Sequence, residues 1–278
     1  MTPPSNVPQS DRIHLLEKSR DLLGWQLIQE SLASYACSPV TSDLCRSLVP
    51  YDDVESANDA LDTTKEMVDL LAGGDPFPIN PFDDFTPIRN EALERQILDS
   101  AQCLAVLKLL RVVRSVHRSI EKQNDFPLLK SLNARLDPLA ALFNELDRCV
   151  DDEGEIKENA SLELRQAIRE VQAAKQKLES KVSKLFSNEN YKEAIQDIYH
   201  TEREGRLVIP VKSDKRSHIE GIVHDSSGSG QTLYVEPSSI VPLNNQLKIN
   251  RLAVDREKVL ILQSLTRQVI DSSGTIAG

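Results

Sequence analysis

Residues 158–186 read ENASLELRQAIREVQAAKQKLESKVSKLF, and this stretch decides the fold. Its seam positions repeat every seven residues in two series, one of Leu164, Val171, Leu178 and Leu185, the other of Ile168, Lys175 and Val182. Such a repeat predicts a long helix that pairs with a second helix in a coiled coil. At 1.5 Å per residue this helix would be about 43 Å long. Its outward positions are more basic than acidic, with Arg165, Arg169, Lys175, Lys177, Lys181 and Lys184 against Glu163, Glu170 and Glu179.

The second helix is predicted from Leu243 to about Ile270, where helical spacing returns. Between the two helices the period is that of β-strands. The expected strands are Arg206–Lys212, Ile219–His224 and Gln231–Glu236, with the Gly-rich loop Asp225–Gly230 before the last of them. This order predicts a β-hairpin, and Pro210 predicts that its strand lies at a sheet edge or is bulged. The two helices are therefore expected to run antiparallel. The expected strands and the segments that connect them, which we call the β module, would lie at the tip of the two helices.

Composition excludes several classes of protein. Aromatic residues make up only 4% and glycine is scarce, so an all-β fold is excluded and a mainly α fold is expected. The formal charge of −10 divides into −8 for residues 1–150 and −2 for residues 151–278, which excludes a uniformly basic nucleic-acid binder. No apolar run approaches the roughly 20 residues that span a bilayer, and the N-terminus has no signal-peptide features. A cytoplasmic protein with no membrane partner is therefore expected.

Motifs for catalysis are absent from the sequence. No Gly-Lys dipeptide occurs and hence no P-loop, the histidines lack the spacing of metal ligands, and the four cysteines form no C-x-x-C pair. His218 and His224 fall on one expected strand, but no nucleophile accompanies them. We therefore expect no catalytic residue, no metal site and no cofactor in this chain.

The candidate nucleic-acid-binding residues cluster in the β module. They are Arg203, Arg206, Lys212, Lys215, Arg216 and His218. Cations at a hairpin tip can bind backbone phosphates without reading sequence. A solvated turn accounts for them equally well, and only their position at the end of a long helix favours binding. A second basic row is interpreted as a solvated helix face, and it consists of Lys108, Arg111, Arg114 and Arg118.

Three segments are distinctive as a set, EREGRLVIPVK at 202–212, GIVHDSSGSGQTLYVEP at 221–237 and LNNQL at 243–247. They resemble the clamp segment of the MutS-II family, the second bacterial MutS paralogue. Residues 25–36 with the following Ser38 and Pro39 resemble that family's first core helix. The acidic turn 151–156 before residues 161–165 also resembles the family. The resemblance covers roughly residues 20–270 of the chain.

The resemblance implies a helical core, a long antiparallel coiled-coil lever and a small β-containing clamp at its tip. The expected boundaries are 1–12 for a disordered lead, 13–155 for the core, 156–190 for the ascending lever helix, 191–241 for the clamp with its β-hairpin, 242–272 for the descending lever helix and 273–278 for a tail. In that family an ATPase domain, which binds ATP and Mg²⁺, follows the levers, commonly with an Smr nuclease domain, and full-length members form homodimers.

The family role that the resemblance implies is suppression of recombination by binding branched DNA, together with splitting of collided ribosomes. The implied partners are thus branched DNA or the ribosome and its rRNA. Because the sequence stops at Gly278 before any Walker motif, we expect a fragment that is not itself an enzyme. The alternative is a protein–protein or dimerisation scaffold without nucleic-acid contact, which the net charge and the shortage of stacking aromatic residues favour.

Overall fold

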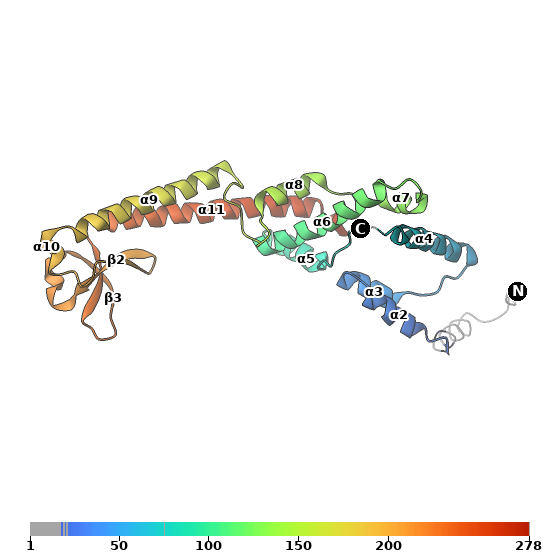
Figure 1. Ribbon diagram of the computed structural model, residues 1–278, viewed down its shortest axis with the longest axis horizontal. Coiled ribbons are helices and arrows are strands. Elements are labelled where there is room, and N and C mark those ends of the chain that lie inside the picture. Colours follow the sequence, from blue (N-terminus) through green and yellow to red (C-terminus); the bar gives the residue numbers. More distant parts are fainter. Residues whose placement is uncertain (1–17, 19, 21, 75, 278) are drawn as a thin grey trace. The chain divides into compact units, whose positions relative to one another are not determined.

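The computed structural model describes residues 18, 20, 22–74 and 76–277 (Figure 1). The chain divides into two compact units. Unit 1 comprises residues 1–147, 152–154 and 265–278, and unit 2 comprises residues 148–151 and 155–264. The expected disordered lead, residues 1–12, lies outside the described residues. Within the described ranges, no helix combines the length and the apolar character needed to cross a bilayer.

Unit 1 is built from helices. They are α2 (Trp25–Ser34), α3 (Pro39–Ser47), α4 (Val54–Ala72), α5 (Phe85–Arg95), α6 (Ser100–Glu121), α7 (Pro127–Asn133), most of α8 (Ala140–Cys149) and α12 (Ser273–Ala277). Helix α6 begins at a capping box, in which Asp99 accepts from Gln102 N and the Gln102 side chain accepts from Asp99 N. The core gathers around α6, and its fully buried members include Leu98, Leu107, Leu110, Leu146 and Leu265.

Helices α2 and α3 pack against each other and leave much of their apolar surface uncovered. Trp25 Nε1 and Gln29 Nε2 both donate to Leu48 O, at 2.9 and 2.8 Å, which ties the start of α2 to the end of α3. Leu27 and Tyr35 are nevertheless 77% and 81% exposed. Side chains of this size are usually buried in a stable core, so this hairpin presents an apolar face.

Unit 2 contains the long helix that the heptad repeat predicts. This helix is α9 (Leu162–Phe186), and it begins where the Ser161 side chain accepts from Leu164 N at 3.0 Å. The sequence pattern begins at Glu158, but α9 begins four residues later, because the capping residue Ser161 lies just outside the helix. At 1.5 Å per residue, α9 is about 38 Å long. Most seam positions of the heptads are buried or half-buried, and Lys175, the polar one, is exposed.

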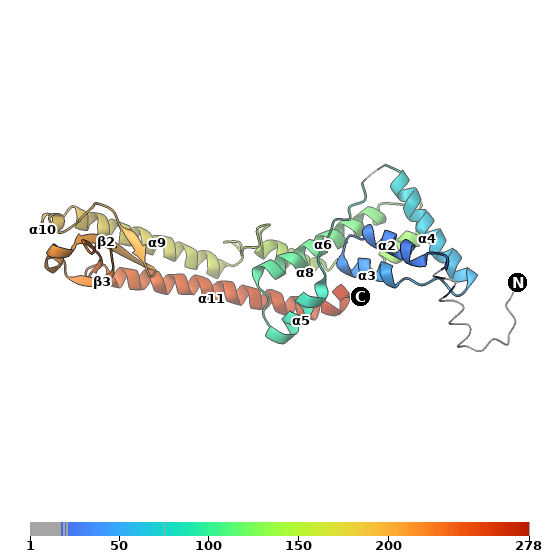
Figure 2. The same ribbon diagram turned by 90° about the horizontal axis from the view of Figure 1, so that it is seen from below.

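The second long helix, α11 (Val241–Asp271), returns beside α9 in the opposite direction, as Figures 1 and 2 show. Its residues up to Ser264 belong to unit 2. A hydrogen bond of 3.0 Å from Asn250 Nδ2 to Glu170 O joins the two helices in the first half of α9. The antiparallel helix pair is therefore present, while its supercoiling as a coiled coil stays a prediction.

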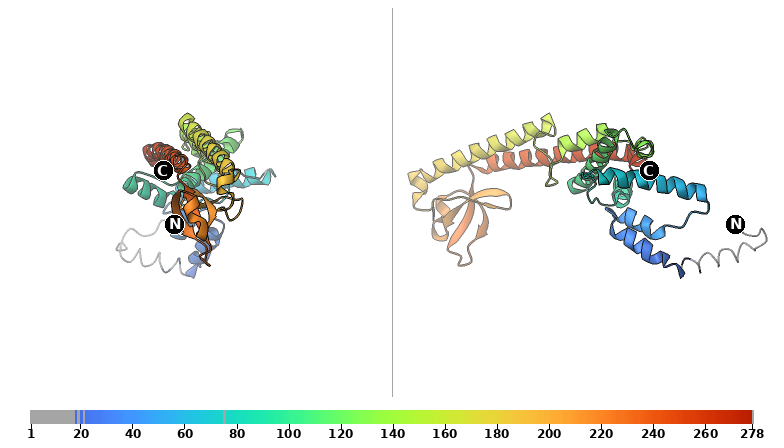
Figure 3. Two further views of the ribbon diagram at one scale, coloured as in Figure 1. Left: turned by 90° about the vertical axis from the view of Figure 1, so that its left-hand side faces the viewer. Right: turned by 45° about the vertical axis from the view of Figure 1, so that its right-hand side comes forward.

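A small sheet lies where α9 ends and α11 begins, beyond the short helix α10 (Glu189–Lys192) (Figure 3). Its four strands are β1 (Thr201–Arg203), β2 (Arg206–Lys212), β3 (Gly221–Ser226) and β4 (Thr232–Pro237). They pair antiparallel in the order β1-β2-β4-β3. The mainly α fold with a small β insertion is thus confirmed. The hairpin of β3 and β4 is also confirmed, whereas β1 is too short for its pattern to show in the sequence.

Two details of the strand prediction are wrong. Strand β2 is internal rather than an edge, since it pairs with both β1 and β4. It tolerates Pro210 because the nitrogen of this residue, which carries no hydrogen, lies on the side away from β4. On that side the Pro210 carbonyl oxygen accepts from Gln196 N at 3.0 Å. His218 lies in the 3₁₀ helix η1 (Ser213–His218) and not on a strand with His224. The polar run SDKRSH contains no apolar side chain to face the core, so it turns instead of extending the sheet.

One apolar core holds the helices and the sheet of unit 2 together. Its buried side chains come from α9 (Leu178, Val182 and Leu185), β2 (Ile209 and Val211), β4 (Val235), α11 (Leu247) and the connecting segments (Ala194, Ile195, Ile219 and Ile240). Every one of these residues is at most 7% exposed. This shared core fixes the rotation of α9 relative to the sheet.

Candidate nucleic-acid interface

The six predicted contact residues all lie in the β module of unit 2, but their side chains have different surroundings. Arg203 is committed to its own sheet. Its Nε donates to Asp225 Oδ2 at 2.8 Å, and its guanidinium carbon lies 4.3 Å from the centre of the Tyr234 ring. The Arg203 guanidinium thereby covers one face of the Tyr234 ring. Tyr199 forms a side-chain hydrogen bond with Tyr234, and this bond raises the pKa of Tyr199.

Arg206 binds a carboxylate that is completely buried. Its Nη1 donates to Glu236 Oε1 at 2.6 Å and its Nη2 donates to Asn245 Oδ1 at 2.6 Å. Glu236 is 0% exposed and also accepts from Asn244 Nδ2 at 2.8 Å. A buried carboxylate without such donors would cost several kcal/mol, so these bonds are a condition of the fold.

His224 completes this arrangement from β3. The pairing of β3 with β4 shifts between Val223 and Asp225, so His224 is the extra residue of a β-bulge. Its Nε2 lies 2.7 Å from Glu236 Oε2. We call Arg206, His224, Glu236 and Asn244 the Glu236 hub. Asn244 further bonds both the N–H and the C=O of Leu207, so the hub joins β2, β3, β4 and α11.

Arg216 also serves the fold. Its two terminal nitrogens donate to Ile219 O and Gly221 O, which closes the turn between η1 and β3. By contrast, no hydrogen bond or ion pair involves the side chains of Lys212, Lys215 and His218 within the part of the chain that the structure describes. His218 is exposed, and the two lysines are half-buried. These three residues are the members of the predicted set that remain available to a partner.

A salt bridge ties β1 to α11 and neutralises another pair of charges. Arg251 donates through both terminal nitrogens to Glu202, at 2.8 and 3.3 Å. The hydrogen bonds from Arg251 hold the pKa of Glu202 below its ordinary value, and the pKa of Arg251 is raised in turn. Arg203 and Arg206 of the β module, and Arg251 of α11, are thus all paired with carboxylates of the β module.

The basic row of α6 in unit 1 is not a simple solvated face. Arg111 pairs with Asp147 at 3.0 Å and with Asp152 at 2.7 Å, and its bond to Asp152 is the main cause of its raised pKa. The Arg114 guanidinium lies 3.9 Å from the centre of the Phe143 ring. Two of the four side chains thus hold unit 1 together, and neither is free to bind phosphate.

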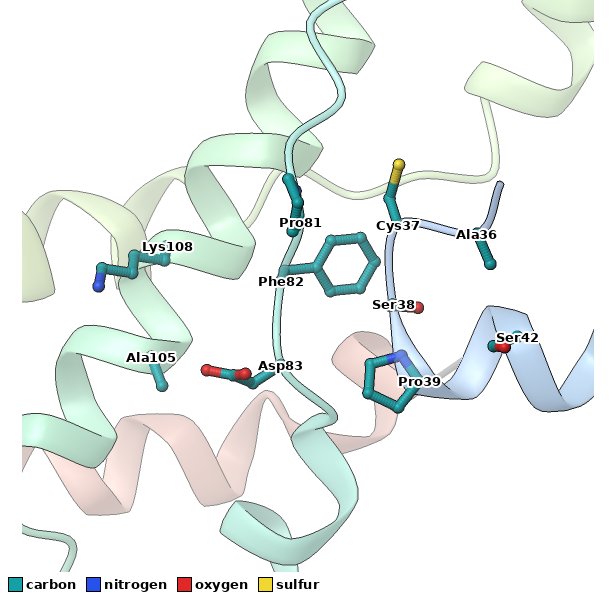
Figure 4. Close-up of a pocket in the computed structure, with 10 residues that line it drawn as sticks. All are labelled: Ala36, Cys37, Ser38, Pro39, Ser42, Pro81, Phe82, Asp83, Ala105 and Lys108. Atoms are coloured by element: carbon teal, nitrogen blue, oxygen red, sulfur yellow. The ribbon is translucent and has the colours of Figure 1, made fainter. Parts of the chain in front are cut away.

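A hollow of about 460 Å³ in unit 1 is the other candidate site (Figure 4). The Phe82 ring reaches into this hollow, and the Phe82 N–H donates to Cys37 O at 3.1 Å. The Lys108 amine points away from the hollow. Ser38 is occupied as the cap of α3, accepting from Thr41 N at 3.2 Å. Among the described residues, no group of three or more His, Cys, Asp or Glu could hold a metal ion. The hollow assembles no nucleophile with a base.

Comparison with known proteins shows that this chain is similar to proteins named endonuclease MutS2. It is 34% identical over 256 residues to that of Thermomicrobium roseum, 30% over 262 residues to that of Halothermothrix orenii and 31% over 257 residues to that of Clostridium botulinum. The resemblance to the MutS-II family is confirmed. Each match covers 91% of this chain but only 32–33% of the relative, so the chain spans about a third of its relatives' length. No family model matches the chain.

The three segments that carry the MutS-II resemblance contain all four residues of the Glu236 hub. The segment EREGRLVIPVK contains Arg206, GIVHDSSGSGQTLYVEP contains His224 and Glu236, and LNNQL contains Asn244. In the folded chain these segments are joined by a buried polar network that links β2, β3 and β4 to α11. The four side chains of the hub attach the β module to α11 and are engaged in doing so.

Proposed function

We propose that this chain is the core, lever and clamp portion of a MutS-II protein, and that unit 2 holds nucleic-acid backbone without reading its sequence. The observation that carries the proposal is the match along 91% of the chain to relatives whose name, endonuclease, denotes action on nucleic acid. Support comes from Lys212, Lys215 and His218, whose side chains bond to none of the residues that the structure describes. Branched DNA or ribosomal RNA is the proposed target, bound by a homodimer of the longer protein.

In this proposal the chain binds and does not catalyse. Nucleotide-driven closure and strand cleavage would belong to residues outside these 278, and the helix pair would carry the β module toward the target. The second candidate, a dimerisation scaffold, is favoured by β3, an edge strand whose Ile222 and Val223 are 50% and 43% exposed. An exposed apolar edge strand can pair with a second copy.

The two candidates differ in how binding responds to salt. The whole chain is titrated with a random-sequence DNA duplex and with a structured RNA over a series of salt concentrations, and its mass is followed by sedimentation. Phosphate contacts give a straight line of log affinity against log salt with a slope of about −0.9 per contact on duplex DNA. For K212Q/K215Q we expect the slope to become shallower by up to about 1.8, since two contacts are lost.

The matched control is K65Q/K122Q, which removes the same charge from exposed positions of unit 1 and should leave the slope unchanged. Dimerisation without salt-sensitive binding to either nucleic acid would replace the proposal with the scaffold.

A further inference from the structure

Three lysines form a row along α9 that the β module does not include. Lys177, Lys181 and Lys184 follow one another by four and three residues, so they lie along one flank of the helix. All three are exposed, and each immediately precedes a residue of the buried core, Leu178, Val182 or Leu185. Because those core residues fix the rotation of α9, the direction of this row, which we call the α9 lysine row, is fixed as well.

The row is not neutralised by acids of its own helix. Between Val171 and Asn188 the only acidic residue is Glu179, which at 100° per residue lies on the opposite side of α9 from the row. No ion pair involves the three lysines within the described part of the chain. Lys177 and Lys181 also repel each other at a spacing of four residues, which disfavours an isolated helix.

Stabilisation of the helix dipole does not account for the row. That effect is confined to the last turn of a helix, and in α9 the basic residue of the last turn is Lys184 alone. Lys177 and Lys181 lie in earlier turns. Two lysines therefore sit where they repel each other and gain little from the dipole, which points to a partner that carries negative charge.

The row leads to the free lysines of the β module. After α9 and α10 the chain reaches Ala194, whose carbonyl oxygen accepts from Lys212 N at 2.9 Å. Leu185, beside Lys184, and Val211, beside Lys212, belong to the same apolar core. The α9 lysine row and the β-module lysines are thus parts of one folded body.

We propose that the α9 lysine row is the main phosphate-binding surface of this chain and that it takes the backbone of a double-stranded nucleic acid. This inference rests on the proposed function and names the surface that performs it. The row is about 10.5 Å long at 1.5 Å per residue. Measured along the axis of a duplex, that length corresponds to about three phosphates of one strand, at an axial rise of about 3.4 Å each. No aromatic residue lies between Val171 and Leu185 to stack unpaired bases, so a duplex suits the row better than a single strand.

The test compares two triple variants of the whole chain, K177Q/K181Q/K184Q and the control K65Q/K108Q/K122Q. Both remove three charges from exposed positions, but the control positions lie in unit 1. Binding to a random-sequence DNA duplex is measured from about 50 to about 200 mM salt. We expect the α9 variant to lose about 2.7 from the salt slope, three times 0.9. Over that range its affinity should then fall about 40-fold less than that of the unaltered chain, while the control follows the unaltered chain.

A third variant, K177R/K181R/K184R, keeps the charge and should bind like the unaltered chain even if glutamine at these positions weakens the helix. Equal slopes for the α9 variant and the unaltered chain, or equal losses in both glutamine triples, would overturn this inference and leave the proposed function standing. If the unaltered chain itself shows no salt-sensitive binding, the proposed function fails and the inference fails with it.

Discussion

Replacing Gly221 with alanine is expected to unfold the β module of unit 2. A Cβ at this position would collide with Glu236 O and lie 2.8 Å from the Pro237 Cα, and both are backbone atoms that no side-chain rotation can move. The collision falls where β3 pairs with β4, since Gly221 is opposite Pro237. We expect the G221A variant to lose about 3 kcal/mol or more of the free energy of unfolding of this unit.

Because the chain has two units, the loss is best measured where it occurs. Hydrogen exchange of the β2 and β4 amides reports the opening of unit 2, and the amides of α6 in unit 1 serve as an internal reference. The matched control is G228A, since a Cβ at Gly228 meets nothing within 4 Å. Unchanged β4 protection in G221A would show that the strands are not packed as described.

The second large effect is expected for E236A. Removing the carboxylate leaves Arg206, whose side chain is only 23% exposed, without its charged partner and with Asn245 as its remaining acceptor. It also deprives Asn244 and His224 of the same carboxylate. Breaking a buried ion pair from one side typically costs 3–5 kcal/mol, and we expect a loss of about that size in unit 2.

E236A is compared with E220A, which removes an exposed carboxylate from the same module and should change stability by less than about 0.5 kcal/mol. Exchange of the α11 amides near Asn244 should accelerate together with that of β4, because the hub joins them. If E236A and E220A behave alike, the Glu236 hub contributes nothing to the attachment of the sheet.

The long helices and the hairpin could be predicted because their signals are local. The heptads from Leu164 to Leu185 give α9, and the Gly-rich turn before Thr232 gives the β3–β4 hairpin. The sequence pattern places the start of α9 too early, because the true start depends on one hydroxyl, that of the N-cap Ser161. Such a cap leaves no mark on the helical spacing of the apolar residues. Three-residue strands such as β1 carry no period at all.

The surroundings of the predicted contact residues could not be read from the sequence, because their partners are distant along the chain. Arg203 pairs with Asp225 and Arg206 pairs with Glu236, 22 and 30 residues away. A basic cluster of six thus reduces to three side chains with free ends. Glu236 stands in the sequence only as the last residue of an expected strand, and the folded arrangement is needed to show that it is 0% exposed. The outward lysines of α9, by contrast, follow directly from helical spacing.

In the proposed function, unit 2 binds phosphate backbone through the α9 lysine row together with Lys212 and Lys215 of the β module. The most direct measurement is the acetylation rate of each lysine in the whole chain, with and without a saturating random-sequence duplex. We predict that Lys177, Lys181 and Lys184 react more slowly with duplex present, together with Lys212 and Lys215, while Lys65, Lys108 and Lys122 of unit 1 are unaffected. Unchanged rates along α9 under saturating duplex, or equal protection of the unit 1 lysines, would contradict it.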